Sequence, residues 1–335
     1  MADPDALRLL RLHGWNLTSF QTLEPSFRHW YPDRDAFVAY ADTGTAWVAA
    51  GPPICAPDRL EEVTAGFVDA ARARHRRACL FGVGDRFTRR TTMDTLHVGE
   101  QPLWDPRRWT ENLASSRSLR EQLRRARARQ VTVTRLTPAT LDAHRLAALE
   151  ELIAAWLRSR RMAPMGFLVE VLPFHVADER LLFVAEVDGA PVGLLSAVPA
   201  YARNGWLFED LIRHPDAPNG VTQLLVHAGM TEVAAGGAEV VSLGMAPLAG
   251  EVAPSLRWIR RMGAPLYDFA GVHAYKRRLH PHAWEPVHLA VPVGHSPWLA
   301  LLEALRAFAG GSFLRFGLHT LRRRPALLRP PGAHR

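Results

Sequence analysis

The chain has 335 residues, of which 48% are apolar and 22% charged, so its composition is globular and its length suffices for two domains. The sequence predicts no signal peptide, no membrane-spanning helix, no disulfide framework and no metal site, because it lacks an apolar leader, an apolar stretch of about 18 residues and ligand-like Cys or His spacing. The net charge of +8 and the pI of about 10.4 predict a polyanionic partner, either nucleic acid or an anionic lipid surface.

The first hundred residues predict alternating strands and helices. An apolar helix is expected from Leu60, Val63 and Phe67, which recur at helical spacing. The expected strands are residues 36–40, 46–50 and 78–83, with short strands at 95–98 and 102–104.

Residues 116–130 predict an arginine-rich helix. Arg117, Arg120, Arg124 and Arg127 are three or four residues apart and therefore share one face of it. Such a face is either a solvated connecting helix or a stripe that binds phosphates. We favour the stripe, because mutual repulsion of the arginines is relieved by an anion.

A second unit follows the basic helix. Asp188-Gly189 is a strong hairpin turn signal between the expected strands 181–187 and 191–198. A helix over 141–161, a strand over 206–212, a helix over 220–235 and a strand over 239–243 complete the order typical of a GNAT acyltransferase core. The first half has a weaker version of this order. We therefore predict an α/β (α+β) class with a tandem GNAT-like fold, in which two mixed-sheet units, 1–130 and 131–292, are joined by the basic helix.

The last segment, 293–335, predicts a basic amphipathic tail. Trp298, Leu301, Leu302, Leu305 and Phe308 are expected on one face of a helix. Two interpretations stay open: the segment lies on an anionic bilayer, or it ends the fold as a helix packed on the core.

The loop after strand 206–212 does not suit coenzyme A. A GNAT enzyme normally has a Q/R-x-x-G-x-G/A loop there, whose backbone N–H groups hold the pyrophosphate. Here Arg213 is followed by Pro215, Pro218 and a single Gly220. The sequence thus predicts a donor other than coenzyme A and no cofactor.

The runs DLIRHPDAPNG, SLGMAPLAG and LYDFAGVHAYKRRLHPHAWEPVHLAVP resemble the C-terminal catalytic domain of phosphatidylglycerol lysyltransferases of the multiple peptide resistance factor type. VGEQPLWDP, SLREQLRRA and WLRSRRMAPMGFL occur upstream in the same order. The resemblance covers roughly residues 16–292 and implies a tandem GNAT fold with aminoacyl-tRNA as donor. Family members commonly carry an integral membrane portion ahead of this domain, so a stand-alone soluble form is expected. The family's EKGF segment is replaced by residues 161–167, which leaves the amino acid open between lysine, alanine and another.

Transfer of an activated aminoacyl ester to an alcohol requires alignment, a proton acceptor and charge stabilisation. Asp210 is expected to hold the α-ammonium or accept the proton, and a structural pair with Arg213 is compatible with that role. Arg213 suits a phosphate or the terminal ribose. Lys276 is the only lysine among 41 basic residues and matches the lysine of the family motif, so we assign it the oxyanion or the last tRNA phosphate. The residues expected to contact substrate are Tyr275, Tyr267, Gly220, Asn219, Gly244, Met245 and Phe167.

The predicted function is aminoacyl-tRNA-dependent transfer of an amino acid to a hydroxyl acceptor, with phosphatidylglycerol or a related lipid as the expected acceptor. The expected partners are aminoacyl-tRNA and an anionic phospholipid or membrane surface, in the cytoplasm and peripherally on the inner face of the membrane. Transfer to a small molecule in a biosynthetic pathway and a non-catalytic tRNA-binding module remain alternatives.

Overall fold

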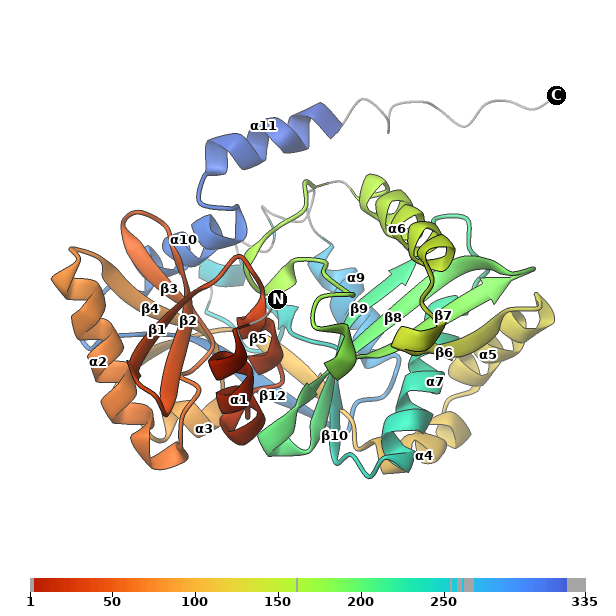
Figure 1. Cartoon of the computed structure of the whole chain (residues 1–335), viewed down its shortest axis with the longest axis horizontal. Coiled ribbons are helices and arrows are strands. Elements are labelled where there is room, and N and C mark those ends of the chain that lie inside the picture. Colours follow the sequence, from red (N-terminus) through yellow and green to blue (C-terminus); the bar gives the residue numbers. More distant parts are fainter. Residues whose placement is uncertain (1–2, 161, 254, 258–260, 262–267, 324–335) are drawn as a thin grey trace.

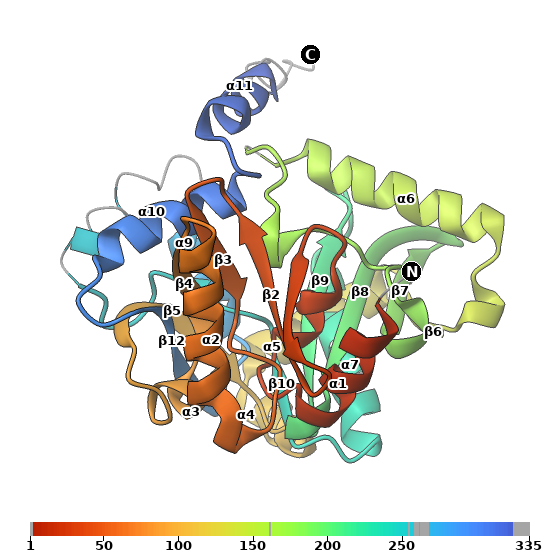
Figure 2. The same ribbon diagram turned by 60° about the vertical axis from the view of Figure 1, so that its left-hand side comes forward.

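The computed structural model describes residues 3–160, 162–253, 255–257, 261 and 268–323. It contains two mixed sheets that lie side by side and are covered by helices (Figures 1 and 2). In the part of the chain that is described, no helix is both long and apolar enough to cross a bilayer.

The first unit is built on a seven-stranded sheet of order β1-β2-β3-β4-β12-β5-β11. Its early elements confirm the predicted strands and helix, since apolar runs and helical spacing are local signals. In chain order they are α1 (Pro4–His13), η1 (Ser19–Leu23), β1 (Arg28–Asp33), β2 (Ala36–Asp42), β3 (Ala46–Ala50), α2 (Leu60–Ala73), β4 (Arg77–Val83), α3 (Asp85–Thr88) and β5 (Asp94–Leu103).

The two faces of this sheet bury different partners. One face packs on α2, where Val63 and Phe67 meet Val38 and Leu80. The other face packs on α1, η1 and the second unit in a larger apolar cluster. Because both faces are covered, the central strands are apolar on both sides.

Strand β5 corrects the expectation of two short strands at 95–98 and 102–104. It runs without a break because β12 (Ala283–Val291) pairs antiparallel along its whole length, from Ala283 opposite Leu103 to Val291 opposite Asp94. The partner strand is nearly 200 residues away in sequence, so local pattern alone does not reveal it.

Two helices connect the units, α4 (Trp109–Ser115) and α5 (Arg117–Ala128). Helix α5 is the predicted basic helix, and the Ser116 hydroxyl caps its N-terminus by accepting from the Leu119 N–H. Leu119, Leu123 and Ala126 face α7 in the core of the second unit.

The second unit is a five-stranded sheet of order β10-β9-β8-β7-β6 with α7 on one face and α6 on the other. The predicted hairpin is confirmed, because Asp188 and Gly189 both have positive φ, 50° and 79°, as a type I′ turn requires. The elements are β6 (Thr132–Leu136), α6 (Ala143–Arg158), β7 (Leu181–Val187), β8 (Ala190–Ala200), β9 (Gly205–Arg213), α7 (Val221–Ala235) and β10 (Val240–Ser242).

The same succession occurs in both units. In each, antiparallel strands lead to a helix and then to a strand that returns parallel: β3 and β4 around α2, and β9 and β10 around α7. The predicted tandem GNAT-like fold of mixed α/β class is therefore confirmed.

The predicted boundaries do not separate the sheets, however. β11 (Ala246–Pro247) and β12 lie within 131–292 but belong to the first sheet, whereas α5 lies within 1–130 but packs in the second unit. A strand exchange of this kind ties the two units into one body.

Three further helices complete the described chain: α9 (Phe269–Arg277), α10 (Pro297–Phe308) and α11 (Phe313–Arg323). Helix α10 covers part of the first sheet, and α11 extends from it at the upper edge of Figure 1.

Candidate active site

Asp210 lies on β9, where that strand pairs with β8 beside an irregularity in register. Asp210 is opposite Ser196, whereas Phe208 is opposite Ala197, so Glu209 is an extra residue in β9. The irregularity turns both acids inward, and only 7% of Asp210 is exposed.

Arg180 is the cation beside these acids. Its guanidinium donates to Ser196 Oγ at 2.9 Å, to the His175 carbonyl at 2.6 Å and to a Glu209 carboxylate oxygen. The Arg180 and Glu209 side chains are 1% and 5% exposed. A buried ion pair such as Arg180–Glu209 requires good geometry and additional hydrogen bonds to offset the loss of solvation.

Glu24 brings a third carboxylate from the first unit. It follows η1, is 3% exposed, and its electrostatic environment includes Glu209, Asp210 and Arg180. The Arg180 guanidinium also lies over the Phe20 ring of η1, with 5.3 Å from its central carbon to the ring centroid. The acid cluster, which we define as Glu24, Glu209 and Asp210 with Arg180, thus lies where the two units meet.

The acid cluster has three carboxyl groups and one guanidinium. Burial raises the pKa of Glu24 to about 10, and burial next to Glu209 raises that of Asp210 well above its usual range. Both Glu24 carboxylate oxygens, Asp210 Oδ2 and Glu209 Oε1 are buried without a hydrogen-bond partner in the described structure. Such oxygens are suited to accept hydrogen bonds from an added cation.

The possible structural pair between Asp210 and Arg213 is wrong. Ile212 packs on the α6 side of the sheet and Leu211 on the α7 side. By strand alternation Asp210 lies on the α6 side and Arg213 on the α7 side. The Arg213 guanidinium instead donates to the Ala217 carbonyl at 2.7 Å, within the loop before α7.

The N-terminus of α7 is covered by α5. Gly220 has a φ of 93°, and a Cβ there would lie 2.9 Å from the Gln122 carbonyl carbon and closer still to its oxygen. Glycine is therefore required for the contact of the two helices. Gly220 serves packing at this position, while the neighbouring Asn219 is exposed.

Lys276 lies on α9 and is 7% exposed. Its Nζ donates to the Gly244 carbonyl at 2.7 Å and to the Met245 carbonyl at 2.9 Å, so three of the predicted site residues do meet. Burial lowers the pKa of Lys276 to about 7. The described structure gives Lys276 no carboxylate partner, and no contact joins it to Asp210.

The predicted aromatic residues lie in different places. Phe167 is buried among Phe27, Phe81 and Phe308, with ring centroids 5.1 to 6.2 Å apart. Tyr275 packs on the core of the second unit. Tyr267 lies outside the described residues.

The predicted arginine stripe is exposed on the face of α5 opposite α7. Two of its members have local partners: Arg124 pairs with Glu121 at 2.8 Å, and Arg120 donates to the Leu113 and Ala114 carbonyls at the end of α4. Arg117 and Arg127 have no ion pair among the described residues.

Glu24, Arg180, Ser196 and Glu209 were not predicted as site residues. The signal for Glu209 was available, because FED interrupts an apolar strand and acids inside such a strand need buried partners. The others come from distant segments. Within the described residues no cluster of three or more His, Cys, Asp or Glu has a metal-binding arrangement.

Comparison with known proteins gives consistent matches. A family model described as phosphatidylglycerol lysyltransferase, C-terminal, matches residues 7–291. The chain is 25% identical over 230 residues to the lysylphosphatidylglycerol biosynthesis bifunctional protein LysX of Mycolicibacterium vanbaalenii, covering 67% of this chain. It is 27% identical over 155 residues to the phosphatidylglycerol lysyltransferase of Bacillus subtilis, covering 43% of this chain. These matches span only 21% and 18% of the lengths of the two relatives.

Solved structures share the fold. The C-terminal DUF2156 domain from Agrobacterium fabrum superposes with a TM-score of 0.78 at 21% identity, over 92% of this chain and 97% of that one. L-PGS from Bacillus licheniformis has a TM-score of 0.77 at 19% identity, over 95% and 98% of the two chains. FemX is more distant, with a TM-score of 0.57 at 11% identity over 90% of this chain and 99% of that one.

Proposed function

The chain belongs to the family described as phosphatidylglycerol lysyltransferase, C-terminal, and from this premise we propose that it transfers an aminoacyl group from aminoacyl-tRNA to phosphatidylglycerol. The names of the relatives support the lipid acceptor and the transferase activity. The amino acid stays open between lysine, alanine and another.

The acid cluster is the observation that carries the proposal. An aminoacyl group has an α-ammonium, and a lysyl group has a second ammonium on its side chain. Burial and mutual repulsion raise the pKa of both Glu24 and Asp210, so an arriving cation would favour their ionised forms. The unpartnered buried oxygens would accept its N–H groups. In this proposal Asp210 binds the amino group.

The N-terminus of α7 supports a donor other than coenzyme A. In a GNAT enzyme the pyrophosphate binds at this helix terminus, but here the α5 backbone occupies the space beside Gly220. The exposed arginine stripe on α5 offers phosphate contacts instead. We therefore assign the stripe to the tRNA.

Lys276 is proposed to assist at the ester. Its amine uses two N–H groups on the Gly244 and Met245 carbonyls. When protonated it has a third N–H for an oxyanion, and when neutral it has a lone pair for a proton. A pKa of about 7 populates both forms at neutral pH.

The reaction then balances without a cofactor. The acceptor hydroxyl oxygen forms a bond to the ester carbonyl carbon, and its proton passes to a base such as neutral Lys276. When the tetrahedral centre collapses, the bond between that carbon and the ribose oxygen breaks. The ribose oxygen takes up a proton as the tRNA leaves.

The test is incubation of the purified chain with total tRNA charged with radiolabelled amino acids and with phosphatidylglycerol vesicles. We expect label to become ribonuclease-resistant and soluble in organic solvent, and Asp210→Asn to abolish this. Label that becomes ribonuclease-resistant but stays in the aqueous phase would point to a small-molecule acceptor. No transfer with any amino acid would contradict the proposal.

A further inference from the structure

Helices α10 and α11 expose large apolar side chains that the proposed chemistry does not use. Trp298, Leu302 and Leu305 of α10 are 43%, 50% and 43% exposed, and Leu314 and Leu318 of α11 are 79% and 50% exposed. We call these five residues the α10–α11 surface. Isolated exposed leucines are ordinary, but several large apolar side chains exposed at helical spacing on two consecutive helices indicate an interaction site.

The orientation of α10 explains this exposure. The helix buries Ala300, Leu301, Ala304 and Ala307 against the first unit, so small residues face inward. The predicted apolar face is therefore divided. Leu301 faces the core, whereas Trp298, Leu302 and Leu305 point outward. Both interpretations of the tail hold in part, since α10 packs on the core and still presents an apolar face.

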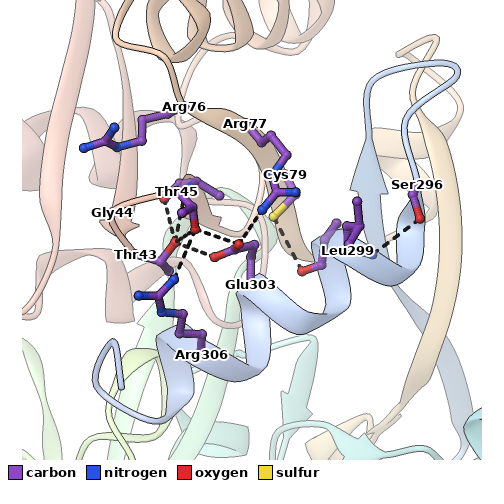
Figure 3. A network of polar contacts seen from close by, with 12 residues as sticks. Thr43, Gly44, Thr45, Arg76, Arg77, Cys79, Ser296, Leu299, Glu303 and Arg306 are labelled. Carbon is purple, nitrogen blue, oxygen red and sulfur yellow. Dashed lines mark hydrogen bonds and ion pairs between the residues drawn. The ribbon is translucent and has the colours of Figure 1, made fainter. Parts of the chain in front are cut away.

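A buried carboxylate fixes α10 in this orientation (Figure 3). Glu303, which is 4% exposed, accepts hydrogen bonds from Thr43 at 2.5 Å and Thr45 at 2.7 Å, and pairs with Arg77 at 2.6 Å. Arg306 also donates to Thr45 at 3.2 Å. Because Glu303 is tied to the sheet, the outward face of α10 is part of a rigid body.

The segment that carries the α10–α11 surface is basic in sequence. Between residues 293 and 335 the sequence has seven arginines and one acid, and that acid is the buried Glu303. Thr45 and Arg77, which both contact Glu303, also line a hollow of about 540 Å³. Its other lining residues include the basic side chains Arg72, His75, Arg76 and His295. Apolar side chains bordered by cations fit an anionic bilayer surface.

We infer that the α10–α11 surface docks on an anionic phospholipid bilayer, with its apolar side chains entering the boundary between headgroups and acyl chains. A second copy of the chain is a poorer occupant, because a symmetric contact would bring each basic border against itself. In Figure 1, α10 lies at the upper left of the molecule and α11 along its top, whereas α5 lies at the right. Docking would thus leave the arginine stripe free for tRNA.

The inference rests on the proposed function only in that the bilayer holds the acceptor lipid. Vesicle binding is measured without aminoacyl-tRNA, so that docking is tested separately from transfer. The whole chain is co-sedimented with vesicles of phosphatidylcholine alone, or mixed with phosphatidylglycerol or with phosphatidylserine. Trp298→Ser/Leu302→Ser/Leu305→Ser is compared with the matched control Leu12→Ser, whose side chain is 59% exposed on α1.

We expect binding to both kinds of anionic vesicle and little binding to phosphatidylcholine alone. The triple variant should bind roughly tenfold or more weakly, with the melting temperature and the Leu12→Ser control unchanged. Equal binding of the triple variant and the wild type would overturn the inference, as would binding confined to phosphatidylglycerol, which would indicate the acceptor site. A change of oligomeric state with vesicle binding unaltered would also overturn it and assign the surface to a second copy. Vesicle binding without aminoacyl transfer would defeat the proposed function and leave the docking surface standing.

Discussion

Lys276 provides the sharpest test of the candidate site, because its burial affects stability and activity in different ways. Its ordinary pKa of 10.5 falls to about 7 in the fold. This difference corresponds to about 5 kcal/mol of preference for the neutral amine. The folded chain therefore releases this proton at lower pH than the unfolded chain does.

The sign of the pH effect follows from proton binding. Between pH 7 and 10.5 the unfolded state binds more protons at Lys276, so its contribution to stability rises with pH by about 1.4 kcal/mol per pH unit. Below pH 7 both states are protonated and the full penalty for burying the charge is present. Lys276→Met keeps an unbranched side chain that is one heavy atom shorter, and it removes the titration. We expect that the free energy of unfolding of Lys276→Met does not rise with pH in this way.

The assay is denaturant unfolding of wild type and Lys276→Met at roughly pH 6, 7, 8 and 9, so that the measurements begin below the pKa of the folded state and extend above it. The wild type should gain about 2 to 3 kcal/mol relative to the variant between pH 7 and 9. The variant also leaves the Gly244 and Met245 carbonyls without their donor, a cost that is independent of pH. Parallel pH profiles for the two proteins would refute the assignment of a neutral buried amine.

The effect on activity is separable from stability. Lys276→Arg keeps the charge but cannot become neutral at accessible pH, and it replaces a compact ammonium with a larger planar group. We expect transfer by the Arg variant to fall by about 100-fold or more in kcat. Near-normal turnover would show that the lone lysine has no part in the chemistry.

Three further outcomes are expected. Asp210→Asn should abolish transfer with little change in melting temperature, because an amide neither pairs with an ammonium nor takes up a proton, and retained activity would remove Asp210 from the site. In the wild type, Glu24 should lower the free energy of unfolding as the pH rises above about 4.5, because the folded state keeps this proton up to a pKa of about 10 and the unfolded state does not. Glu24→Gln should therefore lose less stability with rising pH, and an unchanged slope of unfolding free energy against pH would contradict this. Arg117→Gln/Arg127→Gln should weaken tRNA binding and reduce the slope of log affinity against log salt by roughly one to two, with Arg34→Gln as control. An unchanged salt slope would defeat the tRNA stripe.

The local parts of the fold could be predicted from sequence. The hairpin at Asp188-Gly189 has residues that tolerate positive φ between two apolar runs, and α2 has regular helical spacing. These signals lie within a few residues of the structures they specify. The order of elements was then enough to identify two GNAT-like units.

The exchange of strands between units could not be predicted in this way. β12 pairs with β5 because the two strands are complementary in three dimensions, although nearly 200 residues separate them. The cover of α5 over the N-terminus of α7 is similarly non-local. In sequence Gly220 resembles a remnant of a phosphate-binding loop, yet in the fold the position of a Cβ at Gly220 is occupied by the Gln122 backbone.

The candidate site likewise has a part that could be predicted from the sequence and a part that could not. Asp210 and Lys276 could be proposed from the sequence, Asp210 through its place at the end of the strand before the donor loop and Lys276 through its rarity together with its match to the family motif. The groups that set the protonation of Asp210 and Lys276 could not be predicted from the sequence. Glu24 lies 186 residues from Asp210, and the burial of Lys276 depends on how α9 packs. Residue identity specifies which proton can move, but the desolvation that sets its pKa is a property of the assembled fold. A variant that alters this desolvation without touching the ionisable group should therefore shift the pH profile of transfer and leave the site residues intact.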